Sequence, residues 1–193
     1  MNNASRTEKR NRKLISHGII AKRIHKESFK TLKQVIALEG YHDDGKTSVL
    51  KTLIGELYRR DPKSWKGYRK FDPDKVKITG AKCESEYSGV FCYRGVTIAI
   101  YSRGDNPSVI AGNFEFFARH QAVIGITAVK VEVEGKTTPA TTAYAQVESI
   151  IGFKSTRISI RGKKLREENR EMVIVKKIIT SLDAIVDNLK EGK

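Results

Sequence analysis

The stretch "QVIALEGYHDDGKTSVLKTL" (residues 34–53) decides the fold. It opens with a short apolar run over residues 34–39, which has the length of a buried strand. A turn that contains two glycines follows. Residues 48–60 then carry apolar side chains every three or four positions, the spacing of a helix with one buried face; they are Val49, Leu50, Leu53, Ile54 and Leu57. The sequence therefore predicts a strand, a tight turn and a helix in direct succession.

The turn has the spacing Gly40, four residues, Gly45, Lys46, Thr47. In such a turn, the backbone N–H groups from Asp43 through Thr47 are expected to converge on a phosphate, and the start of the helix adds the positive end of its dipole. Lys46 would then bridge the β- and γ-phosphates, and the Thr47 hydroxyl would bind Mg²⁺. The predicted nucleotide-binding residues are Gly40, Asp43, Asp44, Gly45, Lys46, Thr47 and Ser48.

The middle of this turn, residues 41–44, reads Tyr-His-Asp-Asp. It is bulky and acidic, whereas a loop that surrounds phosphate usually has small residues there. Because backbone groups would bind the phosphate, side chains that point outward can line the mouth of the loop instead.

The rest of the chain alternates strand patterns with helix patterns. A hairpin is predicted around residues 93–95, and further strands at 96–101, 122–129 and 155–160. Helices are predicted from residue 106 onward, over 144–151 and over 167–189. Alternation of this kind favours the α/β class, as a three-layer α/β/α sandwich with a mostly parallel sheet. Ligands of such sheets bind at the carboxyl ends of the strands.

A second acidic element is predicted where the strand at residues 96–101 ends. Asp105 lies in the turn four residues beyond Tyr101, and it is the candidate magnesium ligand besides Thr47. Alternatively, Asp105 only precedes a helix for which Asn106 and Ser108 are the competing caps. The Thr- and Gly-rich stretch 134–142 is a candidate lid.

These features resemble the P-loop NTPases, most specifically over residues 40–47 and more weakly in the S-x-G-D turn at residues 102–105. The order of strand, S-x-G-D, helix and apolar strand is also similar to that of small bacterial and phage P-loop proteins. The loop is similar, too, to the E-G-x-D-G-x-G-K-[ST] loop of thymidylate-kinase-like enzymes, in which an acidic residue at the position of Asp43 contacts the phosphoryl acceptor. The D-R-[YFW] motif of those enzymes is absent, and so is the base-reading motif of GTPases. The resemblance therefore implies ATP rather than GTP.

Two functions remain open from the sequence. The first is an ATP-binding enzyme that hydrolyses or transfers the γ-phosphate with Mg²⁺, as an ATPase or a small kinase. The second is a nucleotide-sensing or nucleic-acid-associated module with little turnover. The candidate catalytic residues are Lys46, Asp105 and Asp43. Asp43 and Asp44 either engage a phosphoryl acceptor or repel a triphosphate and slow turnover.

The 193 residues carry a net charge of +15, and much of the excess lies in two segments. Residues 1–33 contain ten basic and two acidic side chains, and residues 154–170 contain seven and two. Such segments attract polyanions, so nucleic acid is a candidate partner. Residues 1–12 are expected to be a disordered basic arm, and residues 13–193 a single nucleotide-binding domain. No apolar run approaches the ~20 residues that span a bilayer, and without a secretory signal the expected compartment is the cytoplasm.

Overall fold

The computed structural model describes residues 18–41, 44–64, 66–67, 88–131, 138–160 and 168–192. The predicted basic arm lies outside the described residues. So do His42 and Asp43 in the turn.

Within the described residues, six strands form one sheet in the order β2-β3-β4-β5-β1-β6. Strands β4, β5, β1 and β6 run parallel to one another. At one edge of the sheet, β3 is antiparallel to β4 and β2 is antiparallel to β3. The predicted α/β class with a mostly parallel sheet is therefore confirmed. The strands are β1 (Gln34–Gly40), β2 (Lys66–Gly67), β3 (Ser88–Tyr93), β4 (Val96–Tyr101), β5 (Ile124–Lys130) and β6 (Lys154–Ser159).

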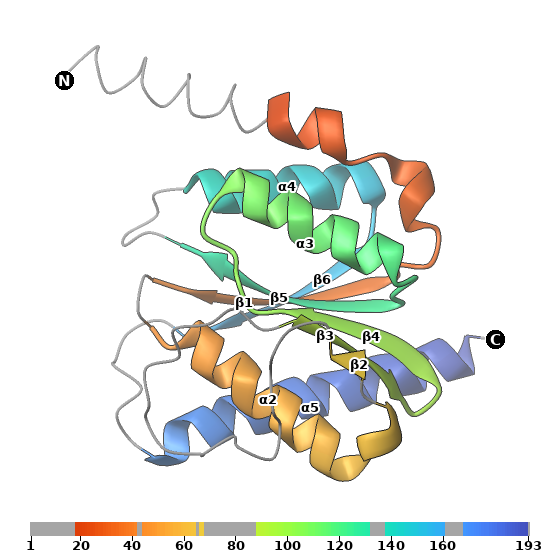
Figure 1. Cartoon of the computed structure of the whole chain (residues 1–193), viewed down its shortest axis with the longest axis vertical. Helices are drawn as coiled ribbons and strands as arrows, with labels where there is room; N and C mark the ends of the chain where they lie inside the picture. Colours follow the sequence, from red (N-terminus) through yellow and green to blue (C-terminus); the bar gives the residue numbers. More distant parts are fainter. Residues whose placement is uncertain are drawn as a thin grey trace.

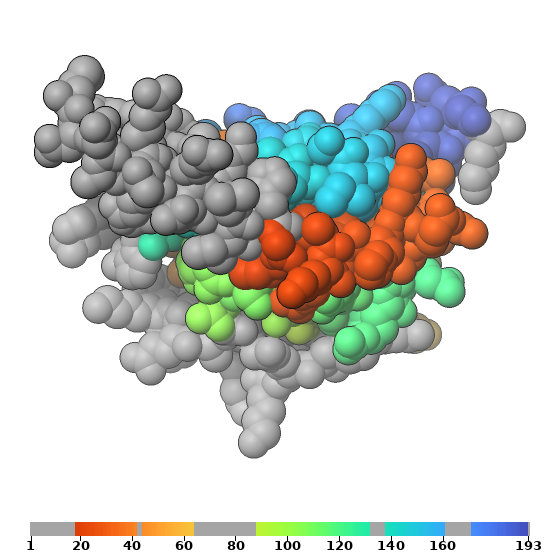
Figure 2. Space-filling view, turned by 90° about the horizontal axis from the view of Figure 1, so that it is seen from above, coloured from red at the N-terminus to blue at the C-terminus, as the bar shows by residue number. Residues whose placement is uncertain are grey.

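Helices cover both faces of this sheet (Figure 1). Helices α2 (Lys46–Arg60) and α5 (Glu168–Glu191) lie on one face, and α3 (Pro107–Arg119) and α4 (Pro139–Ile151) lie on the other. The described part also contains the short helices η1 (Lys26–Phe29) and η2 (Pro62–Ser64). Residues 18–23 are helical as well, and the segment that starts there runs between α3 and α4 (Figure 2).

The alternation of β1 divides the core into two halves. Val35 and Ala37 pack with α3 and α4, whereas Ile36 and Leu38 pack with α2 and α5. Successive side chains of a strand point to opposite faces, so a strand buried on both faces reads as one apolar run. The same reason explains the apolar run predicted at residues 122–129, of which residues 124–129 are buried in β5.

Helix α4 is longer than the sequence indicated. It begins at Pro139 rather than near Tyr144, because the Thr138 hydroxyl accepts a hydrogen bond of 3.0 Å from the Thr141 N–H and proline suits the first helical turn. Residues 139–142 of the candidate lid therefore belong to α4, and its residues 134–137 lie outside the described residues. In the part of the chain that the structure describes, no helix is both long enough and apolar enough to cross a membrane.

Candidate functional site

The turn between β1 and α2 ends in a helix start that has no side-chain cap. Gly45 occupies the N-cap position with φ of 80°, and it has no side chain to offer the first helical N–H groups. By contrast, Asn106 caps α3 and Thr138 caps α4 through side-chain oxygens. The first N–H groups of a helix lack partners within the helix. The start of α2 is therefore suited to accept an anion.

Lys46 is almost entirely buried, with 8% of its surface exposed. Its ammonium donates a hydrogen bond of 3.0 Å to the Gly40 carbonyl and another to the Tyr41 carbonyl. The positive charge is thus held against the carbonyl oxygens of the turn itself. It lies where the chain leaves β1 and begins to turn toward α2.

Gly40 is required by close packing. A Cβ at this position would lie 2.6 Å from Cγ1 of Ile160, so a larger residue would force the loop or the Ile160 side chain to shift. Asp44 lies nearby, and its carboxylate accepts a hydrogen bond of 2.7 Å from the Tyr41 N–H. A negative charge therefore lies within the loop, where the sequence predicted either an acceptor contact or repulsion of a triphosphate.

The end of β4 reaches the start of α2. The Thr47 hydroxyl lies 3.5 Å from the Ser102 carbonyl oxygen, although β5 separates β4 from β1 in the sheet. The turn after β4 bridges this gap by packing onto the end of β5. The Lys130 N–H donates to the Gly104 carbonyl at 2.8 Å, and a Cβ at Gly104 would lie 1.7 Å from the Ala128 carbonyl oxygen.

A buried amide on α3 holds the same turn. Nδ2 of Asn113 donates to the Arg103 carbonyl at 2.6 Å and to the Thr127 hydroxyl at 2.7 Å. Its Oδ1 is buried without a hydrogen-bond partner. Asn113 was not predicted from the sequence, although a polar residue between Ile110 and Phe114 on an apolar helix face was a visible signal.

Asp105 lies in an exposed part of the turn. About 44% of its side chain is accessible, and its carboxylate lies 3.3 Å from Nε of Arg103. The contact with Thr47 comes from Ser102, three residues earlier, so magnesium binding by Asp105 stays a prediction. Of the two competing caps, Asn106 is the one used, since its Oδ1 accepts from the Val109 N–H at 3.0 Å. No group of three metal-binding side chains occurs among the described residues.

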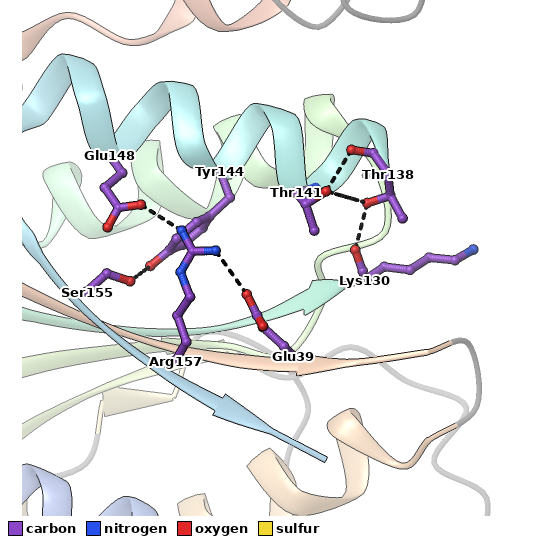
Figure 3. A network of polar contacts seen from close by, with 8 residues as sticks. All are labelled: Glu39, Lys130, Thr138, Thr141, Tyr144, Glu148, Ser155 and Arg157. Carbon is purple, nitrogen blue, oxygen red and sulfur yellow. Dashed lines mark hydrogen bonds and ion pairs between the residues drawn. The ribbon is translucent and has the colours of Figure 1, made fainter. Parts of the chain in front are cut away.

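A second missed residue is Glu39, which directly precedes the turn. It is 8% exposed and points toward α4 (Figure 3). Arg157 lies 3.2 Å from Glu39 and 2.8 Å from Glu148, and its guanidinium lies 5.2 Å from the centre of the Tyr144 ring. The burial of Tyr144 raises the pKa of its hydroxyl, which shares a hydrogen bond with Ser155. The Glu39 carboxylate is thus held by an ion pair just before the loop, on the face of the sheet opposite α2.

No protein-family model, curated protein or solved structure matches the chain significantly. The interpretation of the site therefore depends on its own geometry and chemistry.

Proposed function

We propose that the chain is an ATP-binding protein of the P-loop type, which binds ATP with Mg²⁺ at the β1–α2 turn and hydrolyses or transfers the γ-phosphate. One observation carries this proposal. The Gly40–Thr47 turn joins a buried parallel strand to a helix without a side-chain cap, and it holds the Lys46 ammonium at that junction.

Phosphate binding follows from the groups that the turn presents. Val49 donates its N–H to the Gly45 carbonyl at 3.0 Å, so the regular helical pattern begins there. The N–H groups before it, together with the positive end of the helix dipole, favour a phosphate. Lys46 would move from the carbonyls of Gly40 and Tyr41 to the phosphate oxygens, a short change for a side chain with four methylene groups.

Magnesium suits the oxygen atoms available here. Mg²⁺ prefers oxygen ligands and retains several waters, so it needs few protein groups. The Thr47 hydroxyl would bind it directly, and Asp105 would contact one of its waters from the turn after β4. A bound magnesium ion would neutralise charge on the transferred phosphoryl group. The Ser102 carbonyl oxygen lies 3.5 Å from that hydroxyl.

ATP is proposed rather than GTP because the chain lacks the base-reading motif of GTPases. The choice between hydrolysis and transfer depends on the mouth of the loop. Asp43 would engage a phosphoryl acceptor if the chain is a small kinase, as the resemblance to thymidylate-kinase-like loops implies.

A module with little turnover is the second candidate, and the position of Asp44 favours it. Its carboxylate lies against the Tyr41 N–H inside the loop and would repel a triphosphate. Asp44→Asn retains an oxygen for that hydrogen bond but removes the charge. Tighter ATP binding by Asp44→Asn would support repulsion, whereas weaker binding would show that the carboxylate helps to form the site.

Formation of ADP, measured together with free phosphate, separates these alternatives. The full chain is incubated with ATP and Mg²⁺, alone and then with nucleosides, nucleoside monophosphates or RNA. Turnover with ATP alone or with RNA indicates an ATPase, and ATP consumption only with an acceptor indicates a kinase. Binding without turnover indicates the module. Lys46→Ala should abolish binding, whereas Lys176→Ala, an exposed position on α5, should not change it. An unchanged affinity in Lys46→Ala would refute the site.

A further inference from the structure

A groove of about 840 Å³ lies at the end of the sheet opposite the β1–α2 turn, where β1 and β6 begin. Its walls come from η1, the start of β1, the end of α4, β6 and the second half of α5. In Figure 1 these segments lie on the right, whereas β1 runs into α2 on the left. The groove is therefore separate from the proposed nucleotide site.

The rim of the groove is strongly basic. Its charged residues are Lys26, Lys30, Lys33, Lys154 and Glu27. All four lysines are exposed, and Glu27 lies 3.6 Å from Lys30. Among the described residues, no acid pairs with the other three lysines. Among the described residues, the rim thus carries four positive charges and one negative charge.

The sheet fixes the spacing of these charges. The Lys154 N–H donates to the Lys33 carbonyl at 3.0 Å, and the side chains of Gln34 and Thr156 share a hydrogen bond of 3.0 Å. The two basic segments of the sequence, residues 1–33 and 154–170, are therefore joined at this end of the sheet. Lysines on a rigid frame lose less entropy when they bind a polyanion than lysines on a loose tail would.

Four neutral polar side chains also line the groove, together with apolar residues. They are the side chains of Gln34, Thr156, Ser181 and Asn188. Amides and hydroxyls of this kind can bond to sugars and to base edges, which a single strand exposes and a duplex keeps paired. A concave surface also suits a strand better than it suits a flat lipid surface.

We propose that this groove binds the backbone of single-stranded nucleic acid, with its lysines on the phosphates and its amides and hydroxyls on sugars and bases. Positively charged grooves that follow the backbone are the usual form of such sites. The inference does not depend on the proposed ATP chemistry, because no residue is shared between the two sites.

The test measures the fluorescence anisotropy of a labelled 12-nucleotide RNA with the full chain at several salt concentrations. The groove variant is Lys26→Ala/Lys33→Ala/Lys154→Ala. The matched control is Lys63→Ala/Arg119→Ala/Lys176→Ala, which removes the same charge from exposed positions outside the groove. The groove variant should bind at least about tenfold more weakly, and the slope of log K against log salt should fall by about 2, as expected for three lost contacts to single-stranded phosphates. The control should stay within about threefold of the parent chain.

Three results would overturn the proposal. They are an absence of RNA binding by the parent chain, an equal loss in both variants, or tighter binding to a duplex or to phosphatidylserine vesicles than to the single strand. Lys46→Ala should still bind RNA, and the groove variant should still bind ATP. Failure of one proposal can thus be distinguished from failure of the other.

Discussion

At the scale of single residues, Lys46 shows how the turn is prepared for an anion. A buried ammonium is unfavourable unless hydrogen bonds compensate for its lost hydration. The carbonyls of Gly40 and Tyr41 provide that compensation. A phosphate would provide it more strongly, because hydrogen bonds between two charged groups are about twice as strong as neutral ones. The position of Lys46 is therefore compatible with the proposed phosphate binding.

His120 leads to a prediction about pH. Its ring lies 4.6 Å from the Phe116 ring, and burial, followed by the charge of Arg119, lowers the pKa of His120 below its ordinary value of 6.5. At pH values between the lowered pKa and the ordinary pKa, the folded state then binds fewer protons than the unfolded state. The contribution of His120 to stability is fully present above the ordinary pKa and is lost as the pH falls through the lowered pKa.

When the pH is lowered from about 7.5 to about 5, we therefore expect the melting temperature of His120→Asn to fall less than that of the parent chain. Thermal unfolding followed by circular dichroism at both pH values measures the difference. A parent chain and variant with identical pH dependence would contradict the assignment.

At the scale of elements, the turn between β4 and α3 connects the two halves of the candidate site. Gly104 allows the turn to lie on the Ala128 carbonyl, and Asn113 holds the neighbouring Arg103 carbonyl. Through these contacts Ser102 is placed beside Thr47. Any change that lifts the turn from β5 should therefore disturb the proposed magnesium position.

Gly104→Ala tests this connection. The added methyl would meet backbone atoms that cannot rotate away, so we expect a loss of about 1–3 kcal/mol in the free energy of unfolding and weaker magnesium-dependent ATP binding. Gly18→Ala is the control, because no atom lies within 4 Å of the added Cβ and the helical position should gain up to about 1 kcal/mol. Urea unfolding of both variants checks the prediction, and a stability of Gly104→Ala equal to that of the parent would contradict it.

The helices and strands could be predicted because burial imposes a periodic spacing of apolar residues on the sequence. The apolar run before Gly40 and the spacing from Val49 to Leu57 indicated β1 and α2 within two residues. The pairing of distant strands could not be predicted from the sequence, since register depends on contacts across the whole sheet. For that reason Glu39 was not predicted as a site residue, because its ion pair is with Arg157, in a strand more than 100 residues away.

At the scale of the whole molecule, the two layers of helices pack on one sheet and should unfold together. Phe114 lies at the centre of the α3–α4 layer. The centre of its ring lies 5.4 Å from those of Phe117 and Phe153, 6.0 Å from that of Tyr144 and 6.4 Å from that of Phe29. These neighbours come from α3, α4, η1 and the segment before β6, so one side chain connects several parts of the fold.

Phe114→Ala should lower the free energy of unfolding by about 3–5 kcal/mol, because it leaves a cavity among aromatic rings. Val173→Ala is a fitting control, since Val173 is 62% exposed on α5 and should change stability by less than about 0.5 kcal/mol. Urea unfolding followed by far- and near-ultraviolet circular dichroism should show one common transition in each case. Separate transitions in the two signals would contradict the prediction that residues 13–193 form a single domain.

The central proposal is that the turn from Gly40 to Thr47 binds ATP with Mg²⁺. A calorimetric titration of ATP into the full chain, with and without Mg²⁺, tests it most directly, using the parent chain, Lys46→Ala and Lys176→Ala. The proposal predicts saturable binding at one site in the parent and in Lys176→Ala, strengthened by Mg²⁺, and no measurable binding in Lys46→Ala. Equal affinities in all three proteins, or no binding by the parent chain, would contradict it.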